Sequence, residues 1–570
     1  MFEIYDIEAF KYDWIIVFKC DGRYRVFHND VAELKAYMDQ RKASIFVGFN
    51  NYHYDDKVLN GLMSGRNAYK MTDEIINQGI NVRSKLKRIT LDVIQELQPG
   101  VGLKSSQGNL GMNIVECPVP FDLDRPLTPA EVLEVIKYCK NDVDDTERLF
   151  KEREDYFMAK FEIVKEFNLP IVHVTKTRAV LVSKVLKCRK VKIPDDRLLI
   201  DYDPALDFDI LHPEVVEFYR QAERDFIAGV PFKEIEERQI KINIGGIIYV
   251  FGFGGLHSAL PKYNSGGTFL LIDAKSFYPN LIVNNNFMSR ASSDPQLFTD
   301  LLHTRYRLKD NGDAKEYIYK ILLNATFGAK KSEFNDLFDP KMANNICING
   351  QLILLQLVTE LKGLVQVIQA NTDGIIVKYN NNYDEIMEIV NDFGRRFRLD
   401  FGVDKIIKIA QRDVNNYAIQ FDNGYIDAIG RFKRYAGGDF TQNNLTIIDR
   451  AMVNYYIHDI PVHQTIIDTY QQNDMLPFQI IGKMGRTFDA MVYEYGTAGN
   501  TEYIETQQVN RIFATKDRKY HGVYKRKGAG YTKIQNTSTH NIIHNEDIAT
   551  FDRRLLDLNY YIELCNNNLY

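Results

Sequence analysis

The sequence predicts a multidomain protein of mixed α/β and α+β class. Its 570 residues are enough for two to four domains with full hydrophobic cores. Apolar, strand-like runs occur in two separate parts of the chain, at 3–10 and 44–49 and again at 268–272 and 365–379. Acidic residues adjoin the runs in both parts. We therefore expect two structural units, each with a β-sheet and its own set of acidic side chains.

The first acidic set begins on a predicted strand. Asp6 and Glu8 are two residues apart in EIYDIEAF, so a strand would point both side chains to the same face. The apolar residues around them indicate a core strand rather than a solvated edge. Asn51, Tyr54 and Asp55 follow the next apolar run, SIFVGF.

A predicted helix completes this set. Tyr138 and Asp142 are four residues apart and share one helix face. Thr128 as N-cap, Pro129 in the first turn and Glu131 as the partner in a capping box predict where the helix begins. Four acids from three segments, with a tyrosine, suit two-cation phosphodiester hydrolysis, in which the cations activate a water and stabilise the leaving oxygen.

The second acidic set consists of Asp273 and Asp373. Asp273 follows the run TFLLI and precedes a Ser-Phe-Tyr-Pro turn whose amides could lie beneath phosphates. Asp373 lies in the link Asn-Thr-Asp-Gly between VQVIQ and IIVKY, which predicts the tip of a hairpin. Phosphoryl transfer with two cations about 3.5–4 Å apart requires carboxylates that converge from separate segments.

Helices predicted between these two acids carry basic side chains. Lys320, Asn324 and Phe327 in KILLNATFG share one face of one such helix. A triphosphate is a partner that would explain a lysine on this otherwise apolar face. Arg305 and Lys309, four residues apart on a preceding helix, could face the same ligand, whereas Arg307 points elsewhere.

In this order and spacing the motifs resemble those of the B-family DNA polymerases, in particular the small bacteriophage enzymes, with a DnaQ-like 3′→5′ proofreading exonuclease. The resemblance implies an RNase H-like exonuclease domain followed by a right-hand polymerase. It implies a DNA-directed DNA polymerase that uses primer-template DNA, dNTPs and two Mg²⁺ or Mn²⁺ ions per active site. The expected layout is exonuclease 1–165, connector 166–239, palm 240–299, fingers 300–329, palm 330–440, and thumb with C-terminal region 441–570.

The polymerase motifs transfer residue by residue. Asp273 and Asp373 match the metal ligands, and Tyr278 matches the tyrosine that excludes a 2′-hydroxyl. The remaining matches are Ser276, Phe277, Lys320, Asn324, Phe327 and Gly328 for the nucleotide, and Gly254, Gly255, Lys433 and Tyr435, the last two in RFKRYAGG, for DNA.

The exonuclease motifs transfer in the same way. Asp6, Glu8, Asp55 and Asp142 would hold metal, Tyr138 would orient the attacking water, and Asn51 and Tyr54 would contact the frayed strand. Asp56 is a possible alternative ligand, but the spacing from Asn51 and Tyr54 favours Asp55.

Two residues depart from the family pattern. Asn371 stands where an aspartate is usual, which removes one negative charge, and we expect activity to survive this change. Phe327 stands where a tyrosine is common, and its ring can still stack on a base. If Asn371 marks an inactive site, the alternative function is a DNA exonuclease whose C-terminal half clamps DNA.

The net charge of −5 argues against nucleic-acid binding, but the charge distribution does not. Residues 511–535 hold eight Lys or Arg and one acid, Asp517, interleaved with tyrosines. We expect this segment to contact duplex phosphates without reading sequence. The candidates are Arg518, Lys519, Lys525, Arg526 and Lys527.

Other features exclude several protein classes. The first residues lack a basic signal-peptide region, and no stretch of 18 or more apolar residues predicts a membrane span. Six cysteines form no CxxC pair and indicate a reducing compartment. We expect a monomer without membrane contact in the cytoplasm, that of a bacterial host cell if the protein is viral.

The lengths of two intervals in the polymerase part of the chain predict which partners the protein needs. Two helices would fill the chain from Pro279 to Lys320, and a strand-helix-strand would fill it from Gly328 to Asp373. Neither interval has room for the extra segments of protein-primed phage relatives. We therefore expect extension of a nucleic-acid primer in phage genome replication, with help from a helicase or single-strand-binding protein at downstream duplex.

Overall fold

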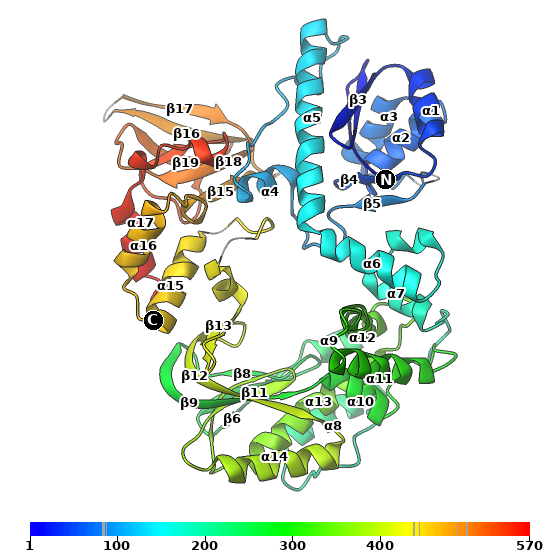
Figure 1. Ribbon diagram of the computed structural model, residues 1–570, viewed down its shortest axis with the longest axis vertical. Coiled ribbons are helices and arrows are strands. Elements are labelled where there is room, and N and C mark those ends of the chain that lie inside the picture. The colour runs from blue at the N-terminus through cyan, green and yellow to red at the C-terminus, as the bar shows by residue number, and fades with distance from the viewer. Residues whose placement is uncertain (83–85, 87, 437–438, 444, 486, 498–499) are drawn as a thin grey trace.

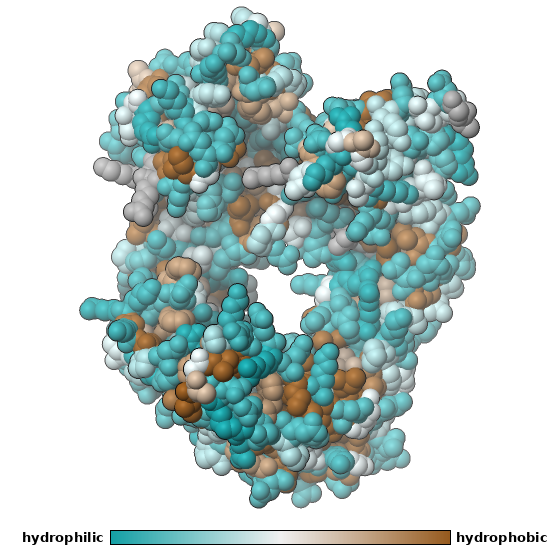
Figure 2. All heavy atoms as spheres, turned by 180° about the vertical axis from the view of Figure 1, so that it is seen from behind, coloured by the Kyte–Doolittle hydropathy of each residue, from teal (hydrophilic) through white to brown (hydrophobic). Residues whose placement is uncertain are grey.

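The computed structural model describes residues 1–570 except 83–85, 87, 437–438, 444, 486 and 498–499. The two glycines that end RFKRYAGG lie outside the described residues. The chain folds into several units of mixed α/β architecture arranged in a ring (Figure 1). Seen from behind, the space-filling view shows an opening through the middle of the molecule (Figure 2).

The N-terminal unit is a five-stranded sheet of order β3-β2-β1-β4-β5, in which β1 pairs antiparallel with β2 and parallel with β4. One face packs on α1–α3 and the other on the long helix α5 (Figure 1). The predicted capping box at Thr128 and Glu131 is present at the start of α5. The bounds are β1 Phe2–Ala9, β2 Trp14–Cys20, β3 Arg23–His28, α1 Val31–Gln40, β4 Ile45–Gly48, α2 Asp55–Met63, α3 Ala68–Thr72, β5 Thr90–Asp92, α4 Leu103–Asn109 and α5 Pro129–Glu152.

Helices connect this unit to a nine-stranded sheet of order β14-β13-β12-β9-β11-β10-β8-β7-β6. Helices α10, α13 and α14 cover one face of the sheet (Figure 1). The connecting helices are α6 Glu154–Glu166, α7 Arg178–Val185, α8 Pro213–Ile227 and α9 Phe232–Glu236. The sheet and its helices are β6 Ile240–Ile244, β7 Ile247–Phe251, β8 His257–Ala259, β9 Tyr263–Ala274, α10 Phe277–Asn284, α13 Pro340–Glu360, β10 Gln366–Asn371, β11 Gly374–Lys378, α14 Tyr383–Phe397, β12 Phe401–Asp413, β13 Asn416–Phe421 and β14 Ile426–Ile429.

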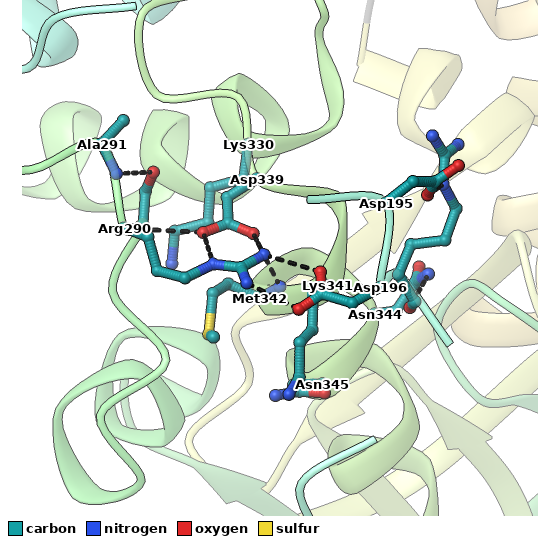
Figure 3. Close-up of polar contacts among 12 residues, drawn as sticks. Asp195, Asp196, Arg290, Ala291, Lys330, Asp339, Lys341, Met342, Asn344 and Asn345 are labelled. Carbon is teal, nitrogen blue, oxygen red and sulfur yellow. Dashed lines mark hydrogen bonds and ion pairs between the residues drawn. The ribbon is translucent and has the colours of Figure 1, made fainter. Parts of the chain in front are cut away.

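Two helices, α11 (Gln296–Asp310) and α12 (Glu316–Lys331), leave this unit and return to it. A polar network fixes their base (Figure 3). The Arg290 guanidinium donates to both carboxylate oxygens of Asp339, at 2.9 and 2.7 Å, and to both oxygens of Asp196, at 2.7 and 2.9 Å. Asp339 is also the N-cap of α13. The network therefore joins the connecting segment, the approach to α11 and the helix that follows α12.

The C-terminal unit contains α15 (Thr446–His458), α16 (Val462–Gln471) and α17 (Leu558–Asn566) beside two small sheets. The first sheet has the order β15-β18-β21, with β15 Ile480–Lys483, β18 Val509–Ala514 and β21 Asn541–Ile543. The second has the order β17-β16-β19-β20, with β16 Ala490–Thr497, β17 Asn500–Thr506, β19 Tyr520–Lys527 and β20 Gly530–Lys533.

The structure corrects one expectation about the layout. A strand-helix-strand was expected between Gly328 and Asp373, but this interval holds α13 and β10. The first strand is missing, because residues 332–339 form turns and irregular chain that lead into α13. The apolar content of the interval belongs to α13, which is buried along most of its length. Among helices of the described residues, none has the length and apolar character needed to span a lipid bilayer.

Candidate functional sites

Acidic side chains from β1 and α5 meet beside the N-terminal sheet. Asp6 and Glu8 share the face of β1 that packs on α5, because side chains alternate along a strand. One carboxylate oxygen from each of Asp6, Glu8 and Asp142 lies within 4.8 Å of the others. Burial and the neighbouring Asp142 raise the pKa of Asp6 to about 7. Burial and Asp6 also raise the pKa of Glu8.

Asp55 lies in the first turn of α2 and is not among the three carboxylates that lie within 4.8 Å of one another. Burial and then the Asp6 carboxylate raise the pKa of Asp55. Asp56 is held elsewhere, since it accepts hydrogen bonds from Tyr5, from Thr90 at 2.7 Å and from Asn51 at 3.1 Å. Buried carboxylates that repel one another are a donor set that divalent cations satisfy, and oxygen ligands suit Mg²⁺. The acids present thus fit a metal site.

Lys104, on α4, was not found from the sequence. Its ammonium donates to the Asp142 carboxylate and lies 4.3 Å from the centre of the Tyr138 ring. The Lys104 charge also opposes the rise in the pKa values of Asp6 and Glu8. No sequence motif marks Lys104, because the contact joins residues 38 positions apart.

Two residues predicted to contact a frayed strand differ in exposure. Tyr54 is half-buried, and its hydroxyl lies 2.9 Å from the Thr72 hydroxyl. Asn51 is fully buried and donates to Asp56. This placement corrects the expectation that the Asn51 side chain contacts DNA, because no part of it reaches the surface.

The second acidic pair lies at one end of the nine-stranded sheet. Asp273 is near the end of β9, and Asp373 is in the two-residue turn between β10 and β11, so the predicted hairpin is confirmed. In the register of β9 and β11, Asp273 lies opposite Gly374. Burial and the Asp373 carboxylate raise the pKa of Asp273 to about 7, and burial raises the pKa of Asp373. The two carboxylates come from separate segments and line the same cavity.

The hairpin turn is held by a close backbone approach from the segment before β8. The amide of Thr372 donates to the carbonyl of Leu256 at 2.9 Å. A Cβ on Gly255 would lie 2.7 Å from the Thr372 hydroxyl oxygen, so this position has no room for a side chain. Gly255 thus supports the Asp373 turn, while Gly254 is exposed with no atom near its Cβ position.

Both acids line a cavity of about 840 Å³ that reaches to α11 and α12. The ten predicted residues that line it come from the β9–α10 turn, the hairpin and the two helices. They are Asp273, Ser276, Phe277, Tyr278, Arg305, Lys309, Lys320, Asn324, Phe327 and Asp373.

Cations without acidic partners distinguish this cavity. Lys275, Lys309 and Lys320 line it, and none of the three forms an ion pair with a described residue. Arg305 differs, because it pairs with Glu316 at 2.7 Å and donates to the Ser276 hydroxyl at 2.7 Å. Arg305 therefore braces the turn at Ser276, which has a left-handed φ of 50°.

Two aromatic rings form a wall of the cavity. The rings of Tyr278 and Phe327 have centroids 4.8 Å apart and are tilted by 60°. Gly350 on α13 lies behind Tyr278, where a Cβ would come within 3.3 Å of its ring. The glycine thus lets the tyrosine lie close to α13.

Several lining residues were missed by sequence reasoning. Lys275, Tyr306, Asp310, Thr372 and Asp400 line the cavity beside the predicted set. Asp404 on β12 contributes to the raised pKa of Asp273. Asn371 is not among the lining residues, and its side-chain amide donates to the Val414 carbonyl at 3.4 Å.

The basic side chains predicted to bind DNA differ in their exposure and in their partners. Lys433 is exposed, and so are Arg518, Lys519 and Lys527. Lys525 lies over the Phe488 ring at 5.5 Å, and Arg526 pairs with Glu505. Tyr435 is half-buried beside Arg450, which donates to its carbonyl. Arg511, the first cation of the 511–535 run, is fully buried and cannot contact phosphates.

Comparisons with known proteins add little about activity. No protein-family model matches the chain. A solved structure of the family B DNA polymerase from the archaeon Pyrobaculum calidifontis is similar at a TM-score of 0.43 and 14% identity, over 99% of this chain and 76% of that one. These values assign neither fold nor activity.

A curated relative from Marchantia polymorpha matches one segment. It is 35% identical over 57 residues, which make up 10% of this chain and 74% of the relative. This match places the chain in the same family as the uncharacterized mitochondrial protein ymf34, a name that states no activity.

Proposed function

We propose that this protein is a DNA-directed DNA polymerase with a 3′→5′ proofreading exonuclease. The observation that carries the proposal is the cavity at the end of β9, which is lined by two carboxylates, Asp273 and Asp373, and by three lysines that pair with no acid among the described residues. Such a site suits a ligand that brings negative charge and divalent cations together. A nucleoside triphosphate with bound Mg²⁺ or Mn²⁺ has this chemistry.

Each group in the cavity has a role in nucleotide addition. Asp273 and Asp373 would hold two Mg²⁺ or Mn²⁺ ions, which when bound neutralise charge on the phosphates and the attacking 3′ oxygen. Lys309 and Lys320 would bind the triphosphate, and Arg305 would keep the Ser276 turn in place beneath it. Tyr278 would pack under the sugar, where a 2′-hydroxyl would collide with the ring.

The acids around Asp6 support the second activity. Asp6, Glu8, Asp55 and Asp142 would hold the cations for hydrolysis, and Tyr138, beside Lys104, would orient the attacking water. A nuclease that removes the nucleotide just added by the same chain is a proofreading activity. The opening seen in Figure 2 lies in the middle of the molecule, and DNA would pass there.

The setting of the reaction follows from the two short intervals. Helices α11 and α12 fill the first, and α13 with β10 fills the second. No segment remains in either to dock a priming protein or to part a duplex. We propose that a monomer extends a nucleic-acid primer in phage genome replication in the host cytoplasm, with a helicase or single-strand-binding protein ahead of it.

Extension of a 5′-labelled primer on a template, with and without dNTPs, tests both activities at once. Longer products with dNTPs and shorter ones without are expected. Shortening without any extension would instead favour an exonuclease that only clamps DNA. Transfer of a deoxynucleotide to a protein hydroxyl, or efficient synthesis through a long downstream duplex by the protein alone, would refute the proposed priming and partners.

A further inference from the structure

The short helix α4 lies between the N-terminal acidic cluster and the C-terminal unit. It has seven residues, fewer than an isolated helix needs to be stable in water. Its position therefore depends on what it packs against. Two different units of the protein supply those contacts.

One side of α4 reaches the acidic cluster. Lys104 donates to Asp142 and lies over the Tyr138 ring, as described above. One turn later Gln107 donates to Asp145 on α5. The position of the Lys104 ammonium thus depends on the position of α4.

The C-terminal end of α4 is held by Arg511 on β18. The Arg511 guanidinium donates to the carbonyls of Gly108 and Met112, at 3.3 and 2.6 Å. On its other side it donates to the Gln479 side chain at 2.8 Å and to the carbonyl of Glu546. Gln479 itself donates to the Gly108 carbonyl at 2.9 Å.

The Arg511 guanidinium is fully buried without an acidic partner among the described residues. Its partners are carbonyl oxygens and one amide. The Gly108 carbonyl also accepts from the Gly111 amide at 3.0 Å, and Met112 lies three residues beyond the end of α4. Arg511 therefore joins both the helix end and the turn after it to the C-terminal sheet, and carbonyls at a helix end carry partial negative charge that suits a cation.

The packing at this point is tight. A Cβ on Gly108 would lie 2.6 Å from the Ile481 side chain and 2.9 Å from that of Ile114. Ile114, Ile481 and Val509 form a small apolar cluster of their own between the two units. The end of α4 consequently has little freedom to shift while β15 and β18 stay in place.

We propose that Arg511 is a positioning residue for the exonuclease, which holds α4 against the C-terminal sheet and so places Lys104 on Asp142 and Tyr138. The inference rests on the proposed nuclease function. It makes the C-terminal unit, through Arg511 at 369 residues from Asp142 in the sequence, part of the support of that active site.

The test compares Arg511→Gln with Arg553→Gln. Arg553 donates to the carbonyls of Tyr470 and Gln471 at the end of α16, so it caps a helix inside the C-terminal unit without touching α4. Arg511→Gln should lower kcat for digestion of single-stranded DNA by about 10- to 100-fold, with KM and single-nucleotide incorporation changed by less than about twofold. Arg553→Gln should leave both activities unchanged.

A double mutant shows whether the effect passes through Lys104. In a Lys104→Met background, Arg511→Gln should cause less than about a twofold further loss, because the group it positions is gone. Hydrogen exchange is the readout independent of activity, and amides 103–112 should exchange faster in Arg511→Gln than in the wild type. Digestion at the wild-type rate, or independent losses in the double mutant, would overturn the inference.

Gly108→Ala tests the same contact between α4 and the C-terminal sheet if Arg511→Gln does not fold. The added Cβ would lie 2.6 Å from the Ile481 side chain while Arg511 is retained, so we expect it to disturb the contact between α4 and β15 and to cause the same selective loss of digestion. A Gly108→Ala protein with normal digestion would overturn the inference. If the wild type itself digests no DNA, the proposed nuclease function fails; if the wild type digests and these variants match it, only the role of Arg511 fails.

Discussion

The two acidic clusters of this protein differ in the cations around them. The N-terminal cluster gathers Asp6, Glu8 and Asp142, and the lysine beside it is already engaged by Asp142. The cavity at the end of β9 has Asp273 and Asp373 with three lysines that no described acid neutralises. The first arrangement calls for cations alone. The second calls for cations together with an anionic ligand. This difference supports the proposal of one hydrolytic and one nucleotide-binding site.

The largest effect should come from removing one acid from each cluster. Asp373→Ala should reduce nucleotide incorporation by about a thousandfold or more, about 4 kcal/mol in the barrier, and should leave digestion of single strands unchanged. The reason is that Asp373 would hold the cations, and water cannot replace the negative charge of a carboxylate that does so. Single-turnover incorporation and digestion of a labelled strand measure the two rates.

The matched control is Asp6→Ala combined with Glu8→Ala. This variant should lose digestion and gain net synthesis, because cycles of addition and removal stop. If either variant loses both activities, the two clusters do not act independently.

A smaller effect should follow from removing one of the three lysines that pair with no described acid. Lys320→Ala should lower kcat/KM for dNTP by about 10- to 100-fold, since a hydrogen bond to a charged group contributes about 1.5–3 kcal/mol. Lys315→Ala is the control, because Lys315 precedes α12 and pairs with Glu166 at 2.9 Å. Equal losses in both variants would mean that Lys320 acts through the stability of α12 and not through the nucleotide.

The parts of these sites that the sequence predicts are local ones. Helical periodicity places Lys320, Asn324 and Phe327 along α12, and all three line the cavity. The residues at 128–131 define the start of α5, and Asn-Thr-Asp-Gly defines the hairpin turn. Each of these predictions depends on residues within one or two turns of one another, where backbone geometry is decisive.

The residues that the sequence does not reveal depend on contacts between distant segments. Lys104 reaches Asp142 from another helix, and Asp400 lines the cavity from the segment before β12. Arg511 belongs to a basic run, but it is buried by partners more than 390 positions away, Gly108 and Met112. Asn51 turns inward and donates to Asp56. The seven strands of the C-terminal unit were likewise not predicted.

The raised pKa values predict how stability depends on pH. The pKa of Asp6 is about 7 in the folded protein, against an ordinary 3.8, so the folded state binds more protons than the unfolded state between about pH 4 and 7. Stability should therefore fall as the pH rises through this window in the presence of a chelator. Thermal unfolding followed over this range measures the slope.

The same experiment compares the two clusters. Asp6→Asn should flatten the pH dependence more than Asp273→Asn, because the Asp6 carboxylate also raises the pKa values of Glu8 and Asp55. Mg²⁺ or Mn²⁺ should restore stability at the alkaline end, by about 2.7 kcal/mol at a concentration of 100 times Kd. The same pH slope in Asp6→Asn and in the wild type would show that Asp6 is not held in a desolvated cluster.

The smallest effect is expected at Asn371. Its side chain donates to the Val414 carbonyl and accepts from the Thr372 hydroxyl, at 3.4 and 3.3 Å, and it does not line the cavity. Asn371→Asp adds a negative charge next to the turn that holds Asp373, but outside the pair that would bind the cations. Incorporation should change by less than about tenfold, or about 1.4 kcal/mol in the barrier, as measured at saturating dNTP over a series of Mg²⁺ concentrations. A shift of the Mg²⁺ midpoint with an unchanged maximal rate would mean that the charge acts at a distance. A gain well above tenfold in the maximal rate would instead place residue 371 among the metal ligands, and it would show that a site with two carboxylates and three free lysines lacks an anion that its chemistry needs.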